Sequence, residues 1–458
     1  MEYLDFIKNK SIKTKTYGID VDVDQLNSKL FDFQKFCVKK ALHHRVFCLF
    51  EECGLGKTLQ QLEWAFNVVT KTGGNVLIVA PLCVTKQTAL EEAPKLGYQV
   101  TICKKQADVK KGINITNYEM LDHFNCDEFV GVVLDESSIL KNYTGSTRTK
   151  LKKYFSNTEY KLCCTATPAP NDLMELLNHA DFLGVMSTAQ ALSNYFINDF
   201  KTGDWRLKGH ATRDFYRWCC SWSINIDTPS DIGFDDSLYV LPKLNEQIII
   251  VDTFNDEINI DDGLFGNINM SATGYHKEKK RTAKDRAKQC AAIIEKHCDE
   301  QFIIWCDTNY EADWLIHYIP EATEVRGDNK PREKEDATIR FKNGEIRILI
   351  SKATIFGYGM NFQKCHNVIF CGLTYSYENY YQALRRIYRF GQINEVNSWI
   401  VLGSTEKNIL NVINRKKKNQ ERLKNSMDTS VKQIQLIELK EREVDEVVSE
   451  KIEQPSFL

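Results

Sequence analysis

Short apolar runs alternate with helical stretches in two separate parts of the chain, and this alternation limits the fold more than any other feature. In the first part, the strand-like runs include NVLIVAP (75–81) and GVVLDES (131–137). In the second part, they include QFIIWCD (301–307), RILISKA (347–353) and NVIFCGL (367–373). Short β-branched runs that alternate with helices favour a parallel sheet covered on both faces, so the pattern predicts an α/β fold.

The alternation stops between the two parts, which predicts two α/β halves separated by a spacer. A length of 458 residues also favours two or three domains. We expect a polar lead-in over 1–24, a first α/β half over 25–188, an inserted helical and irregular spacer over 189–285, a second α/β half over 286–412, and a charged helical tail over 413–458. The tail is as easily explained by a solvated helix with a frayed end as by a functional element.

The composition is that of an ordinary soluble protein. Apolar residues make up 43% and charged residues 27%, and the formal charge is -2. This balance gives no global signal for nucleic acid, although it leaves room for a local basic groove. The 15 cysteines form no C-x-x-C pair, which favours buried, reduced cysteines in the cytoplasm and no structural zinc site. No apolar run has the length of a membrane span, so we expect no membrane partner.

The segment GLGKT (54–58) lies between an apolar strand and a helical stretch. In such a turn, backbone N–H groups and the helix N-terminus can wrap a phosphate chain. Lys57 would neutralise the β- and γ-phosphates, and the Thr58 hydroxyl would bind Mg²⁺. The full consensus has glycine at position 51, where this chain has Glu51. Taken alone, GLGKT fits an ordinary strand-to-helix turn equally well.

The run VVLDES (132–137) ends a predicted strand with two carboxylates, Asp135 and Glu136. At a carboxyl strand end the chain turns, so both side chains can face a bound phosphate. Asp135 would hold Mg²⁺ through water, and Glu136 would orient and deprotonate the attacking water. A solvated pair at a strand end is the alternative, and it is the weaker one when a phosphate loop precedes the pair in the same sheet.

Seven segments occur together in a fixed order: EECGLGKTLQ, VAPLCVTKQ, ITNYEML, VVLDESS, CCTATPAPN, SKATIFGYGMNFQ and YQALRRIYRFGQ. In this order they resemble the motifs of superfamily 2 helicases and ATPases, most closely the Swi/Snf-like branch. The last block matches the pattern Q-x-x-x-R-x-x-R-x-G-Q at Gln382, Arg386, Arg389, Gly391 and Gln392. Within that branch the chain also resembles compact DEAD/DEAH-box-type helicases of phages and prophages.

The resemblance implies two RecA-like lobes that bind ATP and Mg²⁺ between them. It assigns catalytic roles to Glu136, Lys57, Arg386 and Arg389, with the two arginines reaching the γ-phosphate. ATP would be bound by Gln34, which reads adenine, and by Gly54, Leu55, Gly56, Lys57, Thr58 and Gly359. Thr58 and Asp135 would hold the metal, and Thr165, Thr167 and Gln392 would couple the lobes. One departure weakens the usual coupling: Ser137 and Ser138 stand where the family often has Ala-His.

The expected nucleic-acid track consists of hydroxyls, amides and backbone N–H groups at strand ends, which suit phosphate contact without base reading. Its members are Pro81, Leu82, Thr85, Lys86, Asn117, Tyr118, Thr308, Asn309, Ser351 and Asn361. Each alone is as well explained by an ordinary loop residue, and the family motifs favour the functional role. Asn361 and Gly359 fall in a block that contacts both nucleotide and nucleic-acid backbone in the family.

Two further groups of residues have open interpretations. A basic cluster precedes the second half and either flanks the track or forms a solvated helix face; it consists of Lys277, Lys279, Lys280, Arg281 and Lys284. The spacer tryptophans Trp205, Trp218 and Trp222 are either core residues or a surface that stacks bases or splits strands.

The segment YYQALRRIYRFGQ (380–392) predicts a single helix that Gly391 ends as a left-handed cap. Arg386 and Arg389 would then share one face and reach a common anion. Arg385 lies outside the family pattern, so we expect it to face solvent or nucleic acid.

These features predict an ATP-dependent DNA translocase or helicase for replication, recombination or repair, with DNA favoured over RNA. An RNA-directed ATPase and a nucleotide-gated DNA clamp that does not travel are the alternatives. Protein partners are not predicted.

Overall fold

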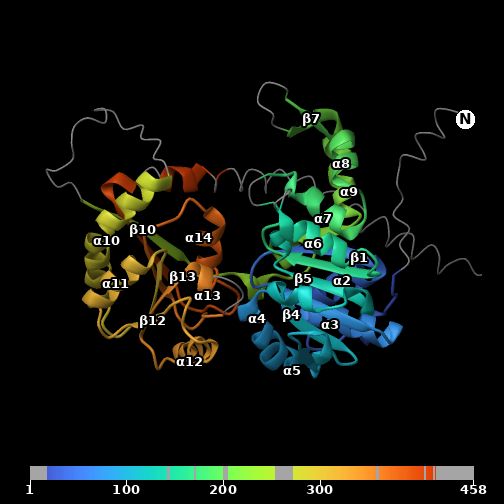
Figure 1. Cartoon of the computed structure of the whole chain (residues 1–458), viewed down its shortest axis with the longest axis horizontal. Coiled ribbons are helices and arrows are strands. Elements are labelled where there is room, and N and C mark those ends of the chain that lie inside the picture. The colour runs from blue at the N-terminus through green and yellow to red at the C-terminus, as the bar shows by residue number, and fades with distance from the viewer. Residues whose placement is uncertain are drawn as a thin grey trace, which may run out of the picture. The chain divides into compact units, whose positions relative to one another are not determined.

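The computed structural model describes residues 18–141, 145–169, 172–199, 205–252, 272–356, 361–406, 409–415 and 418. The chain divides into two compact units: the described residues up to Asp236 belong to the first, and those from Ser237 belong to the second. Figure 1 draws the first unit in blue to green and the second in yellow to red. Among the described residues, no helix is both long and apolar enough to cross a bilayer.

The first unit is built on a seven-stranded parallel sheet with the order β3-β4-β2-β5-β6-β1-β9. Its strands are β1 (Val46–Glu51), β2 (Asn75–Ala80), β3 (Val100–Ile102), β4 (Ile113–Asn117), β5 (Phe129–Asp135), β6 (Tyr160–Thr165) and β9 (Ser223–Ile226). Because all strands run in one direction, their carboxyl ends meet at one edge of the sheet. A short antiparallel hairpin, β7 (Phe196–Asn198) with β8 (Trp205–Leu207), stands apart from the sheet.

Helices cover both faces of this sheet. They are α2 (Asp32–His43), α3 (Lys57–Thr72), α4 (Leu82–Gln87), α5 (Ala93–Leu96), α6 (Ser146–Tyr154), α7 (Glu175–Leu183), α8 (Thr188–Tyr195) and α9 (Thr212–Cys220). Figure 1 shows α6 and α7 on one face and α3 on the other. The short helix η6 (Ser137–Lys141) follows β5 directly.

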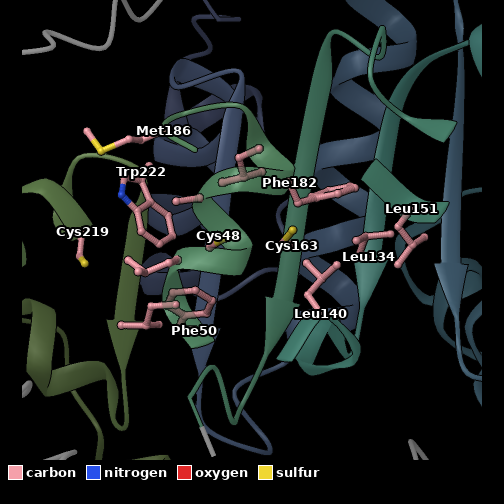
Figure 2. Close-up of a cluster of buried hydrophobic side chains, with 14 of the residues drawn as sticks. Cys48, Phe50, Leu134, Leu140, Leu151, Cys163, Phe182, Met186, Cys219 and Trp222 are labelled. Carbon is pink, nitrogen blue, oxygen red and sulfur yellow. The ribbon is translucent and has the colours of Figure 1, made fainter. Parts of the chain in front are cut away.

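Alternate strand residues build the core on the α6 and α7 face, as the period of two along a strand requires. Phe50 of β1, Leu134 of β5 and Cys163 of β6 belong to one buried cluster, together with Phe182 of α7 and Trp222. Figure 2 shows these side chains gathered on one side of the strands.

The second unit contains a six-stranded parallel sheet with the order β10-β15-β14-β11-β13-β12. Its strands are β10 (Leu244–Val251), β11 (Phe302–Cys306), β12 (Thr323–Val325), β13 (Ile348–Lys352), β14 (Asn367–Cys371) and β15 (Val396–Gly403). Its helices are α10 (Ala272–Glu295), α11 (Asn309–Tyr318), α12 (Pro331–Lys342), α13 (Ala353–Phe356) and α14 (Tyr377–Leu384). One hydrophobic cluster lies on each face of the sheet.

The predicted α/β fold with two parallel-sheet lobes is confirmed. Elements within the expected spacer 189–285 also belong to the lobes: β9 pairs with β1, and β10 pairs with β15. Sequence patterns did not single out β9 because its four residues, SINI, are too short to show a period. Most of the expected tail 413–458 lies outside the described residues.

Candidate nucleotide site and strand-end loops

The predicted phosphate loop connects β1 to the N-terminus of α3. Gly54 and Gly56 have φ values of 99° and 83°, in the left-handed region that favours glycine. Gly56 also lies against Gln34, whose Nε2 would be only 2.3 Å from a Cβ at this position. The backbone therefore requires both glycines, and the close approach of Gln34 further requires the one at position 56. Thr58 is the second residue of α3.

The ammonium group of Lys57 lies inside the loop. Its Nζ donates to the carbonyl oxygens of Glu51 at 2.7 Å and Glu52 at 3.1 Å. Burial alone would lower the pKa of Lys57, but the negative charge of Cys53, Glu51, Glu136 and Glu52 outweighs burial and raises it. The lysine therefore keeps its positive charge at the start of the helix, where a phosphate would be bound.

Glu51 replaces the first glycine of the consensus, and its side chain is buried under the loop. Its Oε2 accepts from Gln60 Nε2 at 2.7 Å. Burial raises the pKa of Glu51 to about 7, against the opposing effects of Lys57 and Gln60. Near pH 7 this carboxyl group is therefore about half protonated.

Gln34, the predicted adenine reader, is buried against the same loop. Its Nε2 donates to the Leu55 carbonyl at 2.8 Å, and its Oε1 accepts from the Phe31 N–H at 3.0 Å. In this structure the amide thus fixes the phosphate loop to the start of α2. Adenine recognition by Gln34 stays a prediction.

The acidic pair lies two strands away from the phosphate loop, because β6 is between β5 and β1. Asp135 Oδ1 accepts from Gln61 Nε2 of α3 at 2.7 Å, which brings this carboxylate to the first turns of the helix that follows the loop. The Asp135 carbonyl accepts from the Tyr118 hydroxyl at 2.6 Å. The structure therefore brings Lys57, Thr58 and Asp135 to one edge of one sheet.

Glu136 has φ 53°, which is unusual for a residue other than glycine. This conformation costs on the order of 1 kcal/mol and persists only where the surrounding structure enforces it. It turns the chain directly after β5, as the sequence led us to expect at this carboxyl strand end.

The predicted coupling residues Thr165 and Thr167 lie at the end of β6, between the phosphate loop and the acidic pair. Both are buried, and Thr165 Oγ1 accepts from the Thr167 N–H at 3.1 Å. They therefore lie between two candidate catalytic segments, and their coupling role stays a prediction.

The expected track residues of the first unit lie at the ends of β2 and β4, which are neighbours. Leu82 is exposed, whereas Thr85 is buried and its hydroxyl donates to the Leu82 carbonyl at 2.9 Å. Asn117 Nδ2 donates to Glu119 Oε2 at 2.5 Å. The Tyr118 hydroxyl donates to the Asp135 carbonyl, as described above. Lys86 is also exposed, and Pro81 is half-buried.

In the second unit, the expected track residues lie in or after the adjacent strands β11 and β13. Thr308 and Asn309 begin α11, and Asn309 is exposed. Ser351 is buried, and its hydroxyl donates to the Val325 carbonyl at 2.8 Å. Its side chain therefore joins β13 to β12 within the sheet. Asn361 Oδ1 accepts from the Gln363 N–H at 3.1 Å in a local turn. Gly359 lies outside the described residues.

The arginine segment differs from the single helix that we predicted. Helix α14 ends at Leu384, and the chain continues in turns to Gly391. Arg386 and Arg389 therefore lie in a turn and do not share a helical face, and Arg386 is buried. The helix ends early because the Arg386 carbonyl accepts from the Phe362 N–H at 3.0 Å, which draws this segment to the preceding motif.

Gln392 holds the same turn from inside. Its Nε2 donates to the carbonyls of Gln363, Cys365 and Ile387 at 2.9, 3.1 and 3.2 Å. Gly391, at φ 86°, allows this approach. The side chain predicted to couple the lobes thus fixes the arginine segment onto the Asn361 segment.

Arg385 does not simply face solvent. Its guanidinium lies 5.1 Å from the ring centre of Tyr381 and 5.4 Å from that of Tyr388. Cation–π contacts of this kind hold the turn in place.

Burial removes one residue from the basic cluster and settles the interpretation of the spacer tryptophans. Lys279 is buried and pairs with Asp307 at 2.8 Å, so it does not belong to an exposed basic cluster; the other four cations remain exposed on α10. Trp218 and Trp222 are core residues of the first unit, and Trp205 packs against the same cluster.

Sequence reasoning missed Gln61, which holds Asp135, and His179 of α7, whose Nε2 lies 3.1 Å from Ser137 Oγ. Nothing in the sequence distinguishes these residues from their neighbours, since the contacts join segments that are 74 and 42 residues apart.

Comparisons with known proteins identify two families in the chain. Residues 34–214 match the SNF2-related domain, and residues 284–391 match the helicase conserved C-terminal domain. Each match falls within one of the two compact units.

Curated relatives align over limited regions. Helicase SWR1 of Debaryomyces hansenii is 32% identical over 178 residues, which cover 34% of this chain and 11% of the relative. The ATP-dependent RNA helicase FAL1 of Candida glabrata is 30% identical over 96 residues, which cover 20% of this chain and 24% of the relative. The chain thus spans a quarter or less of the length of these relatives.

Among solved structures, the SWI2/SNF2 ATPase core of Sulfolobus solfataricus in complex with dsDNA aligns with a TM-score of 0.42 and 19% identity, over 84% of this chain and 90% of that chain. The two domain matches follow one another in the order of the two sheets. The chain therefore contains a segment similar to the SNF2-related domain, followed by a segment similar to the helicase conserved C-terminal domain.

Proposed function

We propose that the protein is an ATP-dependent translocase that moves along DNA without reading its sequence. The observation that carries the proposal is the hydrogen bond from Gln61 to Asp135, since it places the acidic strand end at the helix that begins with Lys57 and Thr58. A lysine, a hydroxyl and two carboxylates at one sheet edge are the groups that phosphoryl transfer to water requires.

In this proposal, the side chains of the first unit divide the chemistry among them. Lys57 and the loop N–H groups bind the β- and γ-phosphates. Thr58 and Asp135 offer the hard oxygen ligands that Mg²⁺ prefers, and the metal would neutralise charge on the phosphates. Glu136 accepts the proton of the attacking water.

The second unit contributes Arg386 and Arg389, whose positive charges would meet the charge that develops on the γ-phosphoryl group. The exposed strand-end residues of each unit would contact the DNA backbone, so binding should weaken steeply as salt increases. Closure of the two units on ATP and their release after hydrolysis would then drive stepping.

DNA as the track, a role in replication, recombination or repair, a cytoplasmic location and the likeness to compact phage and prophage helicases are finer parts of this proposal. They rest on the sequence motifs, and the name of the solved dsDNA complex points in the same direction for DNA.

The test measures ATP hydrolysis by the full chain with no nucleic acid, single-stranded DNA, duplex DNA, forked DNA and RNA. We expect DNA to stimulate ATP hydrolysis by the wild type, and we expect no such stimulation in Lys57→Ala. Stimulation by RNA alone would assign an RNA-directed ATPase, and the absence of stimulation by any of these nucleic acids would refute the proposal. Displacement of a triplex-forming strand separates travel from a clamp, because a clamp hydrolyses ATP without displacing the strand.

A further inference from the structure

Helix α7 holds η6, the short helix that follows the acidic pair, at both of its ends. At the first residue of η6, Ser137 Oγ lies 3.1 Å from His179 Nε2. At the last residue, the Lys141 carbonyl accepts from Asn178 Nδ2 at 3.0 Å. Two adjacent residues of α7 therefore fix the start and the end of one five-residue segment.

The imidazole of His179 is fully buried and neutral. Burial lowers its pKa to about 4. Its Nδ1 lies 3.4 Å from the Glu175 carbonyl, and the ring also bonds to the backbone of Ser137. The neutral ring is therefore tied to Ser137 through both the hydroxyl and the backbone of that residue. The ring also contacts Phe50 edge to face, with centres 5.2 Å apart, close to the end of β1.

Glu136 lies between two anchored residues. Asp135 is held by Gln61 and Tyr118, and Ser137 is held by His179. The left-handed φ of Glu136 needs such anchors, because relaxation to a common conformation would move either its carboxylate or the start of η6.

We propose that His179, assisted by Asn178, is a positioning residue that sets the carboxylate of Glu136 for proton transfer by fixing η6 through Ser137. The inference rests on the proposed ATP hydrolysis. It adds a residue of α7, a helix that lies outside the seven motif segments of the sequence. It predicts that loss of the His179 contact lowers turnover while ATP binding is retained.

The test compares variants of the full chain. His179→Phe keeps an aromatic ring against Phe50 and removes the ring nitrogen that contacts Ser137, and Ser137→Ala removes the hydroxyl at almost constant volume. We expect kcat to fall on the order of 10-fold in each, since small misplacements of a catalytic group have effects of this kind. The Kd for ATP should stay within about twofold, and the double variant should be no slower than the single ones.

Conservative replacement and a matched control separate positioning from stability. Glutamine can place an acceptor oxygen near the position of Nε2, so His179→Gln should recover most of the rate. His44 is a second buried histidine, with its Nδ1 2.8 Å from the Lys40 carbonyl and its ring 5.0 Å from Phe47 of β1. His44→Phe should reduce stability without changing kcat.

Two results would overturn the inference. Wild-type kcat in both His179→Phe and Ser137→Ala would show that the contact does not position Glu136. A rate loss of equal size in His44→Phe would show that general destabilisation explains the effect.

Amide hydrogen exchange keeps the inference separate from the proposed function. The amides of residues 137–141 should exchange faster in His179→Phe, whatever the ATPase activity, and unchanged exchange would refute the anchoring itself. A wild-type chain with no ATP hydrolysis would refute the proposed function and the catalytic role of His179 together, while an active wild type with unaffected variants would refute the inference alone.

Discussion

The two units organise the carboxyl edges of their sheets with different kinds of side chain. In the first unit, the contacts at this edge come from neutral groups: Gln34, Gln60, Gln61, Tyr118 and His179. In the second unit, buried charges do the same work. Lys279 and Arg286 of α10 pair with Glu311 of α11, and Arg286 also pairs with Glu406 at 3.2 Å.

The difference has a physical reason. A site that binds a triphosphate must keep its own charges for the ligand, and Lys57 and Asp135 form hydrogen bonds with neutral carbonyl and amide groups, which do not neutralise them. The carboxyl edge of the second sheet does not have to keep charges for a triphosphate. Its buried cations and carboxylates can therefore neutralise one another. We therefore expect charge removal to affect mainly rate in the first unit and mainly stability in the second.

The largest effect is expected for Glu136→Gln. Because this carboxylate would serve as the general base, kcat should fall by about 10²- to 10⁴-fold. ATP binding and thermal stability should change little. Steady-state hydrolysis, nucleotide titration and thermal unfolding check the three expectations. Glu159→Gln, which removes an exposed partner of Arg45, is the control. Turnover at the wild-type level would remove the assignment of the base.

Arg286→Met should have the next largest effect. It leaves the buried carboxylates of Glu311 and Glu406 without this cation, which costs about 3–5 kcal/mol of unfolding free energy. Amide exchange in β11 and β14 measures this loss in the second unit separately from the first. Arg326→Met is the control, since its partners Glu324 and Asp313 lie nearer the surface and the loss should be below about 1 kcal/mol. Equal losses of unfolding free energy in Arg286→Met and Arg326→Met would contradict the idea that buried charges stabilise the second unit.

Glu51 provides a pH-dependent test in the first unit. Its pKa is raised from 4.5 to about 7 on folding, so the folded chain binds this proton more tightly than the unfolded chain. The resulting stabilisation is fully present below pH 4.5 and is lost as the pH rises through about 7. Between pH 5 and 8 the wild type should lose on the order of 2 kcal/mol more than Glu51→Gln.

Exchange of the β1 amides at the two pH values reports this difference. An identical pH dependence in the two chains would mean that Glu51 is ionised in the folded state, and that charges are compensated at this edge as they are in the second unit. Glu159→Gln again serves as the exposed carboxylate control.

The smallest effect is expected for Arg385→Ala. It removes the contacts with Tyr381 and Tyr388, which should cost about 1 kcal/mol and loosen the arginine turn. ATP binding by the first unit should be unchanged. Exchange of the amides from 385 to 392 measures the loosening, and a fall in ATP affinity would contradict a purely structural role for Arg385.

Much of the fold could be predicted because its signals are local. Strands such as NVLIVA and FIIWC are continuous apolar runs, and glycines at 54 and 56 mark the loop by backbone conformation alone. The helix through the arginine segment was predicted wrongly because that prediction, too, used only local signals. Its local period favours a helix to Gly391, but the bond from Phe362 to the Arg386 carbonyl, a tertiary contact, ends it at Leu384.

The sequence by itself determined the α/β class, the order of the two halves and the segments that carry Lys57, Asp135 and Arg386, since periodicity and motif spacing are properties of neighbouring residues. Only the tertiary structure decided that Gln61 holds Asp135, that His179 holds Ser137 and that Lys279 is buried in an ion pair. Each of these contacts joins residues far apart along the chain, and which distant side chains meet is settled by how helices pack on a sheet.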